Sequence, residues 1–265
     1  MAVVRRAFQT RRVGHTGTLD PFATGLLVVL VGRATRLAQY LVGMPKEYTG
    51  TVRLGISTTT DDATGETIQQ SDAWTGVTEE AIERAMRSFI GTVDQRPPRF
   101  SAKSVDGRRA YARARRGEVF ELEHQAVQID RFELVGREGP DLRIRAAVGS
   151  GVYVRSLARD LGEKLGCGAH LTVLRRTRVG PFSVNDAATM DEVKAGSAVL
   201  RPAGDAVAHL ETRQIDEPER VFIRNGRAIP DGGTVRTVAL FAAGDLVAVA
   251  ESDGTLLHPS VVLEQ

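Results

Sequence analysis

Residues 142–166 read LRIRAAVGSGVYVRSLARDLGEKLG, and this stretch decides the fold class. Its first seven residues have a strand pattern, and residues 127–135 share it, so we expect these two segments to pair. After a glycine-containing turn, apolar residues recur every three or four positions over 153–165, which predicts an amphipathic helix closed by Gly166. Residues 171–184 return to a strand-like pattern.

The chain before this stretch also mixes strands with helices. Residues 47–56 alternate partly and predict a strand, and residues 61–65 predict a turn. Thr78 can cap a helix that ends before Gly91. Because no regular alternation of strand and helix runs through the chain, we expect an α+β fold with a mixed, mainly antiparallel sheet and flanking helices.

The end of the chain has a different composition. It turns acidic near residues 204–218, and beyond that point short segments are separated by glycines, which is typical of a small β-rich module. We therefore expect a main domain over residues 1–205 and a module over residues 212–265. A module of this size would be marginally stable on its own.

Cysteine, histidine and apolar residues exclude several classes of protein. The chain of 265 residues has one cysteine, which excludes a disulfide framework, and its five histidines show no metal-ligand spacing. The longest apolar stretch, residues 26–31, is too short to span a bilayer, and no signal-peptide pattern is present. The sequence therefore predicts a cytoplasmic protein that binds no membrane and no metal.

The net charge of +2 hides an asymmetry along the chain. Residues 1–181 carry a net charge of +8, and residues 182–265 carry −6. Most of the clustered basic residues are arginines, which bind phosphates in a bidentate manner and stack on bases, so together they favour a polyanion partner over a merely solvated surface. The clusters are Arg5, Arg6, Arg11 and Arg12; Arg96, Arg99, Lys103, Arg108, Arg109, Arg113, Arg115 and Arg116; and Arg175, Arg176 and Arg178.

Four segments could carry chemistry, although each also has an ordinary structural reading. Residues 12–21 form a polar, glycine-containing loop ending in Asp20-Pro21, which by itself is a turn starter. Tyr48 opens a strand and could pack in the core or stack on an unpaired base. Arg155 lies near a helix N-terminus, where a cation is unfavourable, so we expect an acidic partner for it unless it is a surface residue. Residues 95–113 suit an RNA-facing arm or an ordinary basic loop.

Taken together and in this order, the segments resemble the bacterial tRNA pseudouridine-55 synthases of the TruB family. Gly-His-Thr-Gly-Thr-Leu-Asp-Pro at 14–21 is similar to the family's catalytic-aspartate motif, and Lys46-Glu47-Tyr48 to its Lys-x-Tyr motif. Residues 151–157 are similar to its Tyr-Ile/Val-Arg motif, and residues 161–177 to its leucine-containing segment. The tail resembles a short PUA-type RNA-binding module more weakly.

The resemblance implies an activity and a set of catalytic residues. The enzyme would flip one uridine, at position 55 in the T loop of tRNA, out of its stack, break the C1′–N1 bond and rejoin the uracil through C5. Asp20 would be the essential carboxylate, either as nucleophile or through removal of the 2′ proton. Tyr48 would stack on the uracil and remove a proton, and Arg155 would pair with Asp20.

The resemblance also implies contacts to RNA and partners. Tyr153 and Leu174 would line the uracil pocket, and His15 would contact the T loop. Gly17 and Thr18 are expected to bind substrate as well. The RNA backbone is expected to meet Arg12, Arg108, Arg109, Arg175 and Arg176. We expect tRNA, through its T arm, as the partner, no obligatory protein partner, a monomer, and no cofactor.

Two features depart from the family pattern. Family members normally carry a Lys-Pro-x-Gly-x-Thr-Ser segment ahead of the position of residues 2–4, and it supports the catalytic loop. Because the sequence starts at Met1, we expect that segment to be missing. The usual Ser-Ala-x-Lys pattern reads Ser-Ala-Lys-Ser at 101–104, which would alter an RNA contact.

Three alternatives stay open at this point. The first is a non-catalytic tRNA-binding or folding protein on the same scaffold, which an Asp20→Asn variant would distinguish from an enzyme. The second is a metal or small-ligand hydrolase that uses Asp20, Asp61 and Asp62. The third is the guide-RNA-dependent, dyskerin-like branch of the family, which normally has a fuller PUA module than this short tail.

Overall fold

The computed structural model describes residues 1–101, 103–105, 108–109, 113, 116, 118, 120 and 122–264. The predicted RNA-facing arm over 95–113 lies partly outside the described residues. Arg108 and Arg109 form strand β9 (Arg108–Arg109), and their predicted role in RNA binding rests on the sequence alone.

The chain divides into two compact units. The central unit comprises Leu19–Leu26 and Met44–Asp186. The terminal unit comprises Met1–Thr18, Leu27–Gly43 and Ala187–Gln265. The units therefore do not follow a single boundary in the chain, because most of the first 43 residues cluster with the C-terminal part.

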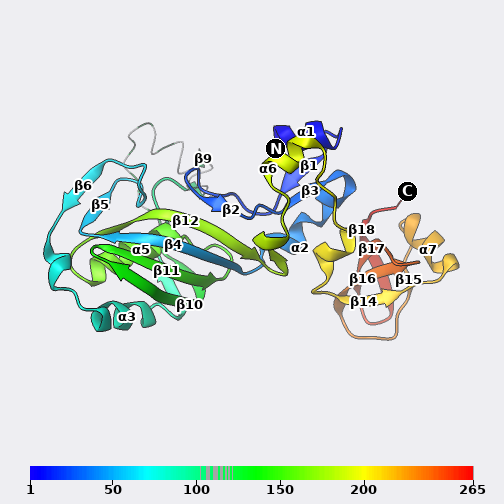
Figure 1. The fold of residues 1–265 in the computed structure, drawn as a ribbon. Coiled ribbons are helices and arrows are strands. Elements are labelled where there is room, and N and C mark those ends of the chain that lie inside the picture. Colours follow the sequence, from blue (N-terminus) through cyan, green and yellow to red (C-terminus); the bar gives the residue numbers. More distant parts are fainter. Residues whose placement is uncertain are drawn as a thin grey trace. The chain divides into compact units, whose positions relative to one another are not determined.

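A seven-stranded sheet forms the core of the central unit, in the order β13-β12-β4-β11-β10-β7 with β2 on β12 (Figure 1). All of its pairings are antiparallel except that of β2 with β12. The predicted pairing of residues 127–135 with 142–148 is confirmed as β10 with β11. The strands are β2 (Thr24–Gly25), β4 (Lys46–Leu54), β7 (Gly91–Gln95), β10 (Gln125–Glu138), β11 (Asp141–Val148), β12 (Ala169–Val179) and β13 (Phe182–Ser183).

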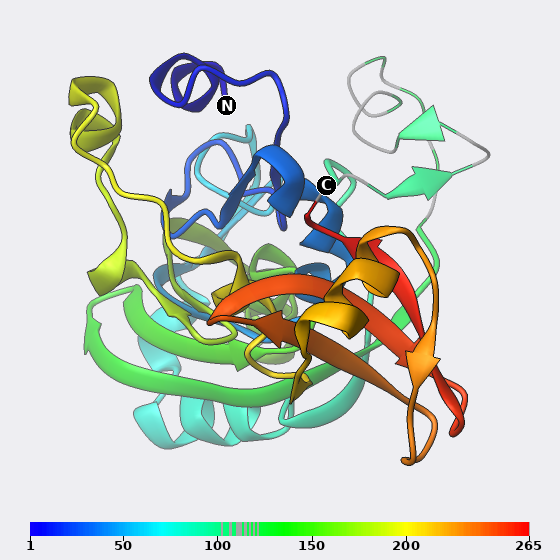
Figure 2. The same ribbon diagram turned by 90° about the vertical axis from the view of Figure 1, so that its right-hand side faces the viewer.

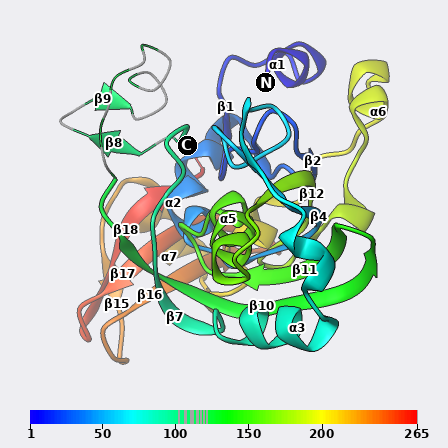
Figure 3. The same cartoon turned by 90° about the vertical axis from the view of Figure 1, so that its left-hand side faces the viewer.

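Two helices pack against this sheet, as Figure 3 shows. Helix α3 (Glu79–Arg87) is capped by the Thr78 hydroxyl, which accepts from the Ala81 N–H at 3.2 Å, as predicted. Helix α5 (Val154–Lys164) packs on β12 and buries the predicted apolar residues. Tyr153 is the N-cap of α5 and not part of its first turn, which corrects the predicted start by one residue.

Short hairpins and one-turn helices fill the rest of the central unit. Beyond β4, strand β5 pairs with β6 in a hairpin, and the tight turn over 61–65 lies between these two strands, with Asp61 at a positive φ of 61°. These small elements are β5 (Ile56–Thr58), β6 (Thr67–Gln70), η2 (Ala73–Gly76), β8 (Ser104–Val105) and η3 (Val184–Asp186).

The terminal unit contains a five-stranded sheet in the order β14-β16-β17-β18-β15, which confirms the predicted β-rich module. Figure 2 shows α7 (Glu217–Arg224) lying against these strands. Its strands are β14 (Glu211–Gln214), β15 (Ile229–Pro230), β16 (Arg236–Ala242), β17 (Asp245–Ser252) and β18 (Leu256–Val262).

The same unit includes the start of the chain. Arg33 and Arg36 donate to the carbonyls of Leu263 and Val262 at 2.8 and 2.5 Å, which ties this start to β18. Within the described residues, no helix is long and apolar enough to cross a bilayer. The remaining elements are α1 (Ala2–Ala7), β1 (Val13–His15), β3 (Val29–Val31), η1 (Gly32–Leu37), α2 (Ala38–Val42), α6 (Met190–Ala195) and η4 (Ala203–Val207).

Candidate active site

The segment that carries Asp20 is fixed on the edge of β12. Gly25 pairs with Arg176, and the Leu26 N–H donates to the Arg176 carbonyl at 2.8 Å. Gly25 has a φ of 96°, and a Cβ there would lie 2.2 Å from the Arg176 carbonyl oxygen. Only glycine allows this approach, so the short β2 strand can anchor the Asp20 loop against the sheet.

Arg155, the second residue of α5, is the centre of the site. Its side chain is 5% exposed, and all five of its N–H groups have acceptors within reach. Nε and Nη2 donate to Asp20 Oδ2 and Oδ1 at 3.0 and 2.8 Å, and Nη2 also donates to the Phe100 carbonyl at 3.1 Å. Nη1 donates to the Thr60 carbonyl at 3.0 Å and lies 3.3 Å from Asp62 Oδ2.

This arrangement confirms the predicted acidic partner of Arg155. The pair with Asp20 is bidentate, a geometry that fixes the carboxylate plane as well as its position. Asp20 keeps 30% of its side chain exposed, whereas Arg155 is buried. The Asp20 carboxylate is therefore accessible to a reactant, and the buried Arg155 guanidinium fixes its position.

Asp62, which the sequence analysis named only as a possible hydrolase residue, is a second partner of Arg155. Its side chain is 5% exposed, and Oδ1 accepts from Thr60 Oγ1, Thr64 N–H and Thr64 Oγ1 at 2.7, 2.9 and 2.5 Å. A buried carboxylate with these donors is a rigid second anchor for Arg155. The signal available in the sequence was an Asp pair in a threonine-rich turn.

The ion pairs of the three aspartates argue against the metal-hydrolase hypothesis. Asp20 and Asp62 both face Arg155, and Asp61 pairs with Arg159 at 3.0 Å, so each carboxylate already meets a cation. Across the described part of the chain, no three His, Cys, Asp or Glu side chains gather in a way that could hold a metal ion. The three aspartates are therefore arranged for ion pairing.

Two tyrosines among the described residues, Tyr48 and Tyr153, lie in the same unit as Asp20. Tyr48, on β4, is 8% exposed, and burial raises the pKa of its phenol, while the neighbouring Arg176 opposes that shift through charge and a hydrogen bond. The Tyr153 backbone is fixed by Gln95, whose amide oxygen accepts from Tyr153 N–H at 2.8 Å and whose amide nitrogen donates to the Tyr153 carbonyl at 3.2 Å. Burial also raises the pKa of Tyr153. Both phenols are therefore held in their neutral form at neutral pH.

Strand β12 carries three predicted site residues, which differ in their exposure. Leu174 is buried, with 4% of its surface exposed, and Arg175 points to solvent. Arg176 is 2% exposed and donates from Nε to the Leu26 carbonyl at 2.8 Å. The predicted contact of Arg176 with the RNA backbone stays a prediction. The period of two along a strand puts Arg176 on the face of Leu174, and that signal was available in the sequence.

The remaining predicted residues belong to the terminal unit. Arg12 and His15 are exposed, and His15 ends β1 opposite Val29. Gly17 and Thr18 follow in the connecting loop, and Thr18 is exposed. They lie within eight residues of Asp20 in the chain, and their predicted contacts with the substrate stay predictions.

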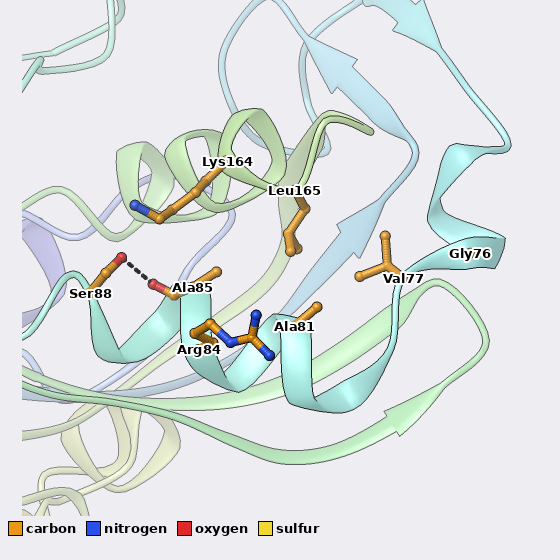
Figure 4. Close-up of a pocket in the computed structure, with 8 residues that line it drawn as sticks. All are labelled: Gly76, Val77, Ala81, Arg84, Ala85, Ser88, Lys164 and Leu165. Carbon is orange, nitrogen blue, oxygen red and sulfur yellow. Dashed lines mark hydrogen bonds between the residues drawn. The ribbon is translucent and has the colours of Figure 1, made fainter.

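A depression between α3 and α5 lies at the other end of α5 from Arg155. Figure 4 shows Lys164 and Leu165 on one side and Ala81, Arg84 and Ala85 on the other. Since Lys164 is nine residues after Arg155, the two places are about 14 Å apart along the helix. The depression is therefore not part of the Asp20 cluster.

The central unit therefore holds a partly exposed carboxylate, Asp20, against a buried arginine, Arg155. The family model for TruB family pseudouridylate synthase (N-terminal domain) matches residues 5–154, and the model for the tRNA pseudouridylate synthase B C-terminal domain matches residues 155–211. The chain belongs to the TruB family of pseudouridylate synthases.

Relatives and solved structures agree with this assignment. A protein named tRNA pseudouridine synthase B from Thermobifida fusca (strain YX) is 45% identical, over 99% of this chain and 92% of the relative. A protein of the same name from Arthrobacter sp. (strain FB24) is 44% identical, over 96% and 85%. The crystal structure of a Cbf5-Nop10-Gar1 complex contains a chain similar at 25% identity and a TM-score of 0.71, over 98% of this chain and 79% of that one.

Proposed function

We propose that this chain isomerises uridine 55, in the T loop of tRNA, to pseudouridine, with Asp20 as the essential carboxylate. Relatives named tRNA pseudouridine synthase B match nearly the whole chain and support a tRNA uridine isomerase. The observation that carries the proposal is the bidentate pair of Arg155 with a solvent-accessible Asp20 in the same unit as Tyr48, Tyr153 and Leu174.

The uracil must leave its stack before Asp20 can reach the sugar. Extrusion of a base costs a few kcal/mol, and an apolar pocket recovers part of that cost. The Tyr48 ring and the Leu174 side chain are the surfaces we assign to the flipped uracil, with Tyr153 at the pocket wall. Tyr48 on β4 and Leu174 on β12 are both buried, and the pairing of these two strands holds the two side chains in place.

Asp20 then acts at the ribose. In one route its carboxylate attacks C1′, and the C1′–N1 bond breaks with its electron pair moving to the uracil. In the other route the carboxylate removes the 2′ proton, and the same bond breaks as a C1′–C2′ double bond forms. In the first route uracil C5 then bonds to C1′ as the bond between C1′ and the carboxylate oxygen breaks. In the second route C5 bonds to C1′ as C2′ takes its proton back from Asp20. Both routes end when C5 loses its proton. Arg155 holds the carboxylate plane in either case.

The contacts to the rest of the tRNA are assigned to arginines and to the loop before Asp20. We assign backbone contacts to Arg12, Arg175, Arg108 and Arg109, and contacts near the uridine to His15, Gly17 and Thr18. The terminal β-rich module is assigned to RNA binding as well. We further propose that the chain acts as a cytoplasmic monomer without a protein partner, metal or cofactor; size-exclusion chromatography with and without tRNA tests its oligomeric state.

Tritium release from an unmodified tRNA transcript labelled at uridine C5 tests the proposal. The unchanged protein should release tritium, and Asp20→Asn should bind the tRNA equally well and release none. Asp94→Asn is the matched control, because Asp94 is an exposed carboxylate on β7. It should release tritium at the unchanged rate.

The two alternatives predict different outcomes. If the unchanged protein binds tRNA and releases no tritium, the non-catalytic RNA-binding hypothesis replaces the enzyme. If release required an added guide RNA, the chain would belong with the guide-dependent branch.

A further inference from the structure

Arg176 is a buried cation that the mechanism above does not use. Its side chain is 2% exposed, in a sheet whose other buried side chains on β12 are apolar apart from His170. Burying a guanidinium costs several kcal/mol unless its donors are satisfied and its charge is used. Its Nε donates to the Leu26 carbonyl at 2.8 Å, which anchors the strand that follows the Asp20 loop. This contact accounts for one of its five N–H groups.

The register of the sheet places Arg176 beside Tyr48. The two residues are direct partners in the antiparallel pairing of β12 with β4, and cross-strand partners share one face of a sheet. Tyr48 is 8% exposed, so the two side chains meet in a buried environment, and they share a hydrogen bond. A guanidinium can only donate, so the Tyr48 oxygen accepts and its own O–H stays available for another partner.

The charged groups around the phenol have opposite signs. Arg176 approaches from β12, and Asp20 approaches from the loop before β2. Lys46 lies two residues before Tyr48 on β4. Burial and the charge of Arg176 lower the pKa of Lys46. The Lys46 Nζ donates to the Met44 carbonyl at 2.7 Å. Burial raises the pKa of Tyr48, and of its two charged neighbours only Arg176 favours a negative charge on the phenol oxygen.

The reaction needs such a negative charge at its last step. When C5 has joined C1′, it still carries a hydrogen that pseudouridine lacks. A base takes this proton, the electron pair of the C5–H bond re-forms the C5–C6 double bond, and the pair of the C6–N1 double bond moves to N1, which takes up a proton. If the base is Tyr48, its oxygen gives one proton towards N1 and receives one from C5, so no further reactant is consumed.

We propose that Arg176 is a positioning residue for this proton transfer: its guanidinium fixes the Tyr48 oxygen and stabilises the negative charge that develops there. The proposal rests on the proposed function, and it assigns the buried arginine of β12 to the deprotonation of C5. Asp20 and Arg155 form one pair, which acts on the ribose. Tyr48 and Arg176 form a second pair, which acts on the uracil.

The test compares Arg176→Met and Arg176→Lys with the unchanged protein. Arg145→Met is the matched control, because Arg145 is exposed on β11 opposite Thr49. Single-turnover pseudouridine formation at saturating tRNA transcript should fall about 10²-fold in Arg176→Met and stay unchanged in Arg145→Met. Affinity for the tRNA should be the same in all of these proteins.

Two readouts separate this role from a structural one. With deuterium at uridine C5, Arg176→Met should show a larger isotope effect than the unchanged protein, because proton removal has become slower. A fluorinated tyrosine of lower phenol pKa at position 48 should restore part of the rate of Arg176→Met. If Arg176→Met does not fold or bind tRNA, the same two readouts apply to Arg176→Lys, which keeps the charge and should lose less activity.

Each contrary outcome has a clear meaning. A variant that binds tRNA and forms pseudouridine as fast as Arg145→Met would overturn the role of Arg176. A slower variant with no increase in isotope effect and no rescue by fluorotyrosine would overturn it too, since that pattern belongs to a structural residue. If the unchanged protein forms no pseudouridine, the proposed function itself fails.

Discussion

The two main sheets of this molecule bury different kinds of side chain. In the terminal unit, residues 247–250 of β17 are Val-Ala-Val-Ala and are each 0% exposed. In the central unit, β4 and β12 bury Tyr48 against Arg176, and α5 buries Arg155 between two carboxylates. A buried ion costs several kcal/mol before its partners compensate, so it stabilises a fold poorly. The comparison separates a sheet whose buried core is apolar from one that also buries charged groups beside its apolar core.

The largest effect is expected from Arg155→Met. The substitution leaves Asp62 as a buried carboxylate without its cation and frees Asp20. We expect the free energy of unfolding to fall by about 3–5 kcal/mol, measured by urea titration, and tritium release to be lost. Arg145→Met, at an exposed position, should change the unfolding free energy by less than about 0.5 kcal/mol. Equal stability in both variants would mean that the buried charges are not coupled.

A substitution in the apolar sheet of the terminal unit should change the stability of the protein and leave its reaction rate unchanged. Leu240 of β16 is 0% exposed, so Leu240→Ala should lower the free energy of unfolding by about 2–5 kcal/mol. Leu200→Ala, where 52% of the residue is exposed, is the control and should be nearly neutral. The single-turnover rate of folded Leu240→Ala at saturating tRNA should equal that of the unchanged protein. A slower rate would place the terminal sheet in the catalytic step.

A backbone substitution tests the anchor of the Asp20 loop. Gly25→Ala puts a Cβ 2.2 Å from the Arg176 carbonyl at a φ of 96°, so β2 must move away from β12. We expect a loss of more than about 1 kcal/mol of stability, together with slower tritium release. Gly43→Ala is the matched control, since Gly43 has a φ of −75° and open space around it, and it should be neutral or stabilising by about 0.4–1 kcal/mol. Unchanged release by Gly25→Ala would show that the anchor does not position Asp20.

The smallest effect is expected in the turn between β17 and β18. Hydrogen bonds from the backbone N–H of Leu256, from Thr255 and from His258 hold the pKa of Asp253 well below its usual range. A lowered carboxyl pKa stabilises the fold above the unfolded-state value of about 3.9 and loses that contribution as the pH falls below it. Asp253→Asn should therefore lower Tm slightly at pH 7, and thermal melts should show the difference shrinking below about pH 4. A difference that is constant with pH would exclude this linkage.

The sequence predicted the elements with local signals and one long-range pair. Alternation and helical periodicity predicted β4, β10, β11, β12 and α5, and the unfavourable charge at the start of α5 predicted an acidic partner for Arg155. Both kinds of inference use residues close together in the chain, or a physical imbalance that must be relieved somewhere in the fold.

The burial of Arg176 and Asp62 could not be inferred in the same way. Arg176 lies where β2, about 150 residues earlier in the chain, pairs with β12, whereas the nearby Arg175 and Arg178 are exposed. Asp62 is buried because its turn folds back onto α5, where Arg155 lies 93 residues later in the chain. Local sequence resembles a basic surface in one case and a polar turn in the other. The sheet register places Arg176 beside Tyr48, and the folded turn places Asp62 against Arg155.

The most direct test of the central claim is to map pseudouridine along a tRNA transcript incubated with the unchanged protein and with Asp20→Asn. Carbodiimide modification followed by primer extension marks each pseudouridine as a stop. We predict one stop, at uridine 55 of the T loop, with the unchanged protein, and none with Asp20→Asn at equal tRNA binding. A stop that persists in Asp20→Asn, or pseudouridine at other positions with none in the T loop, would contradict the account.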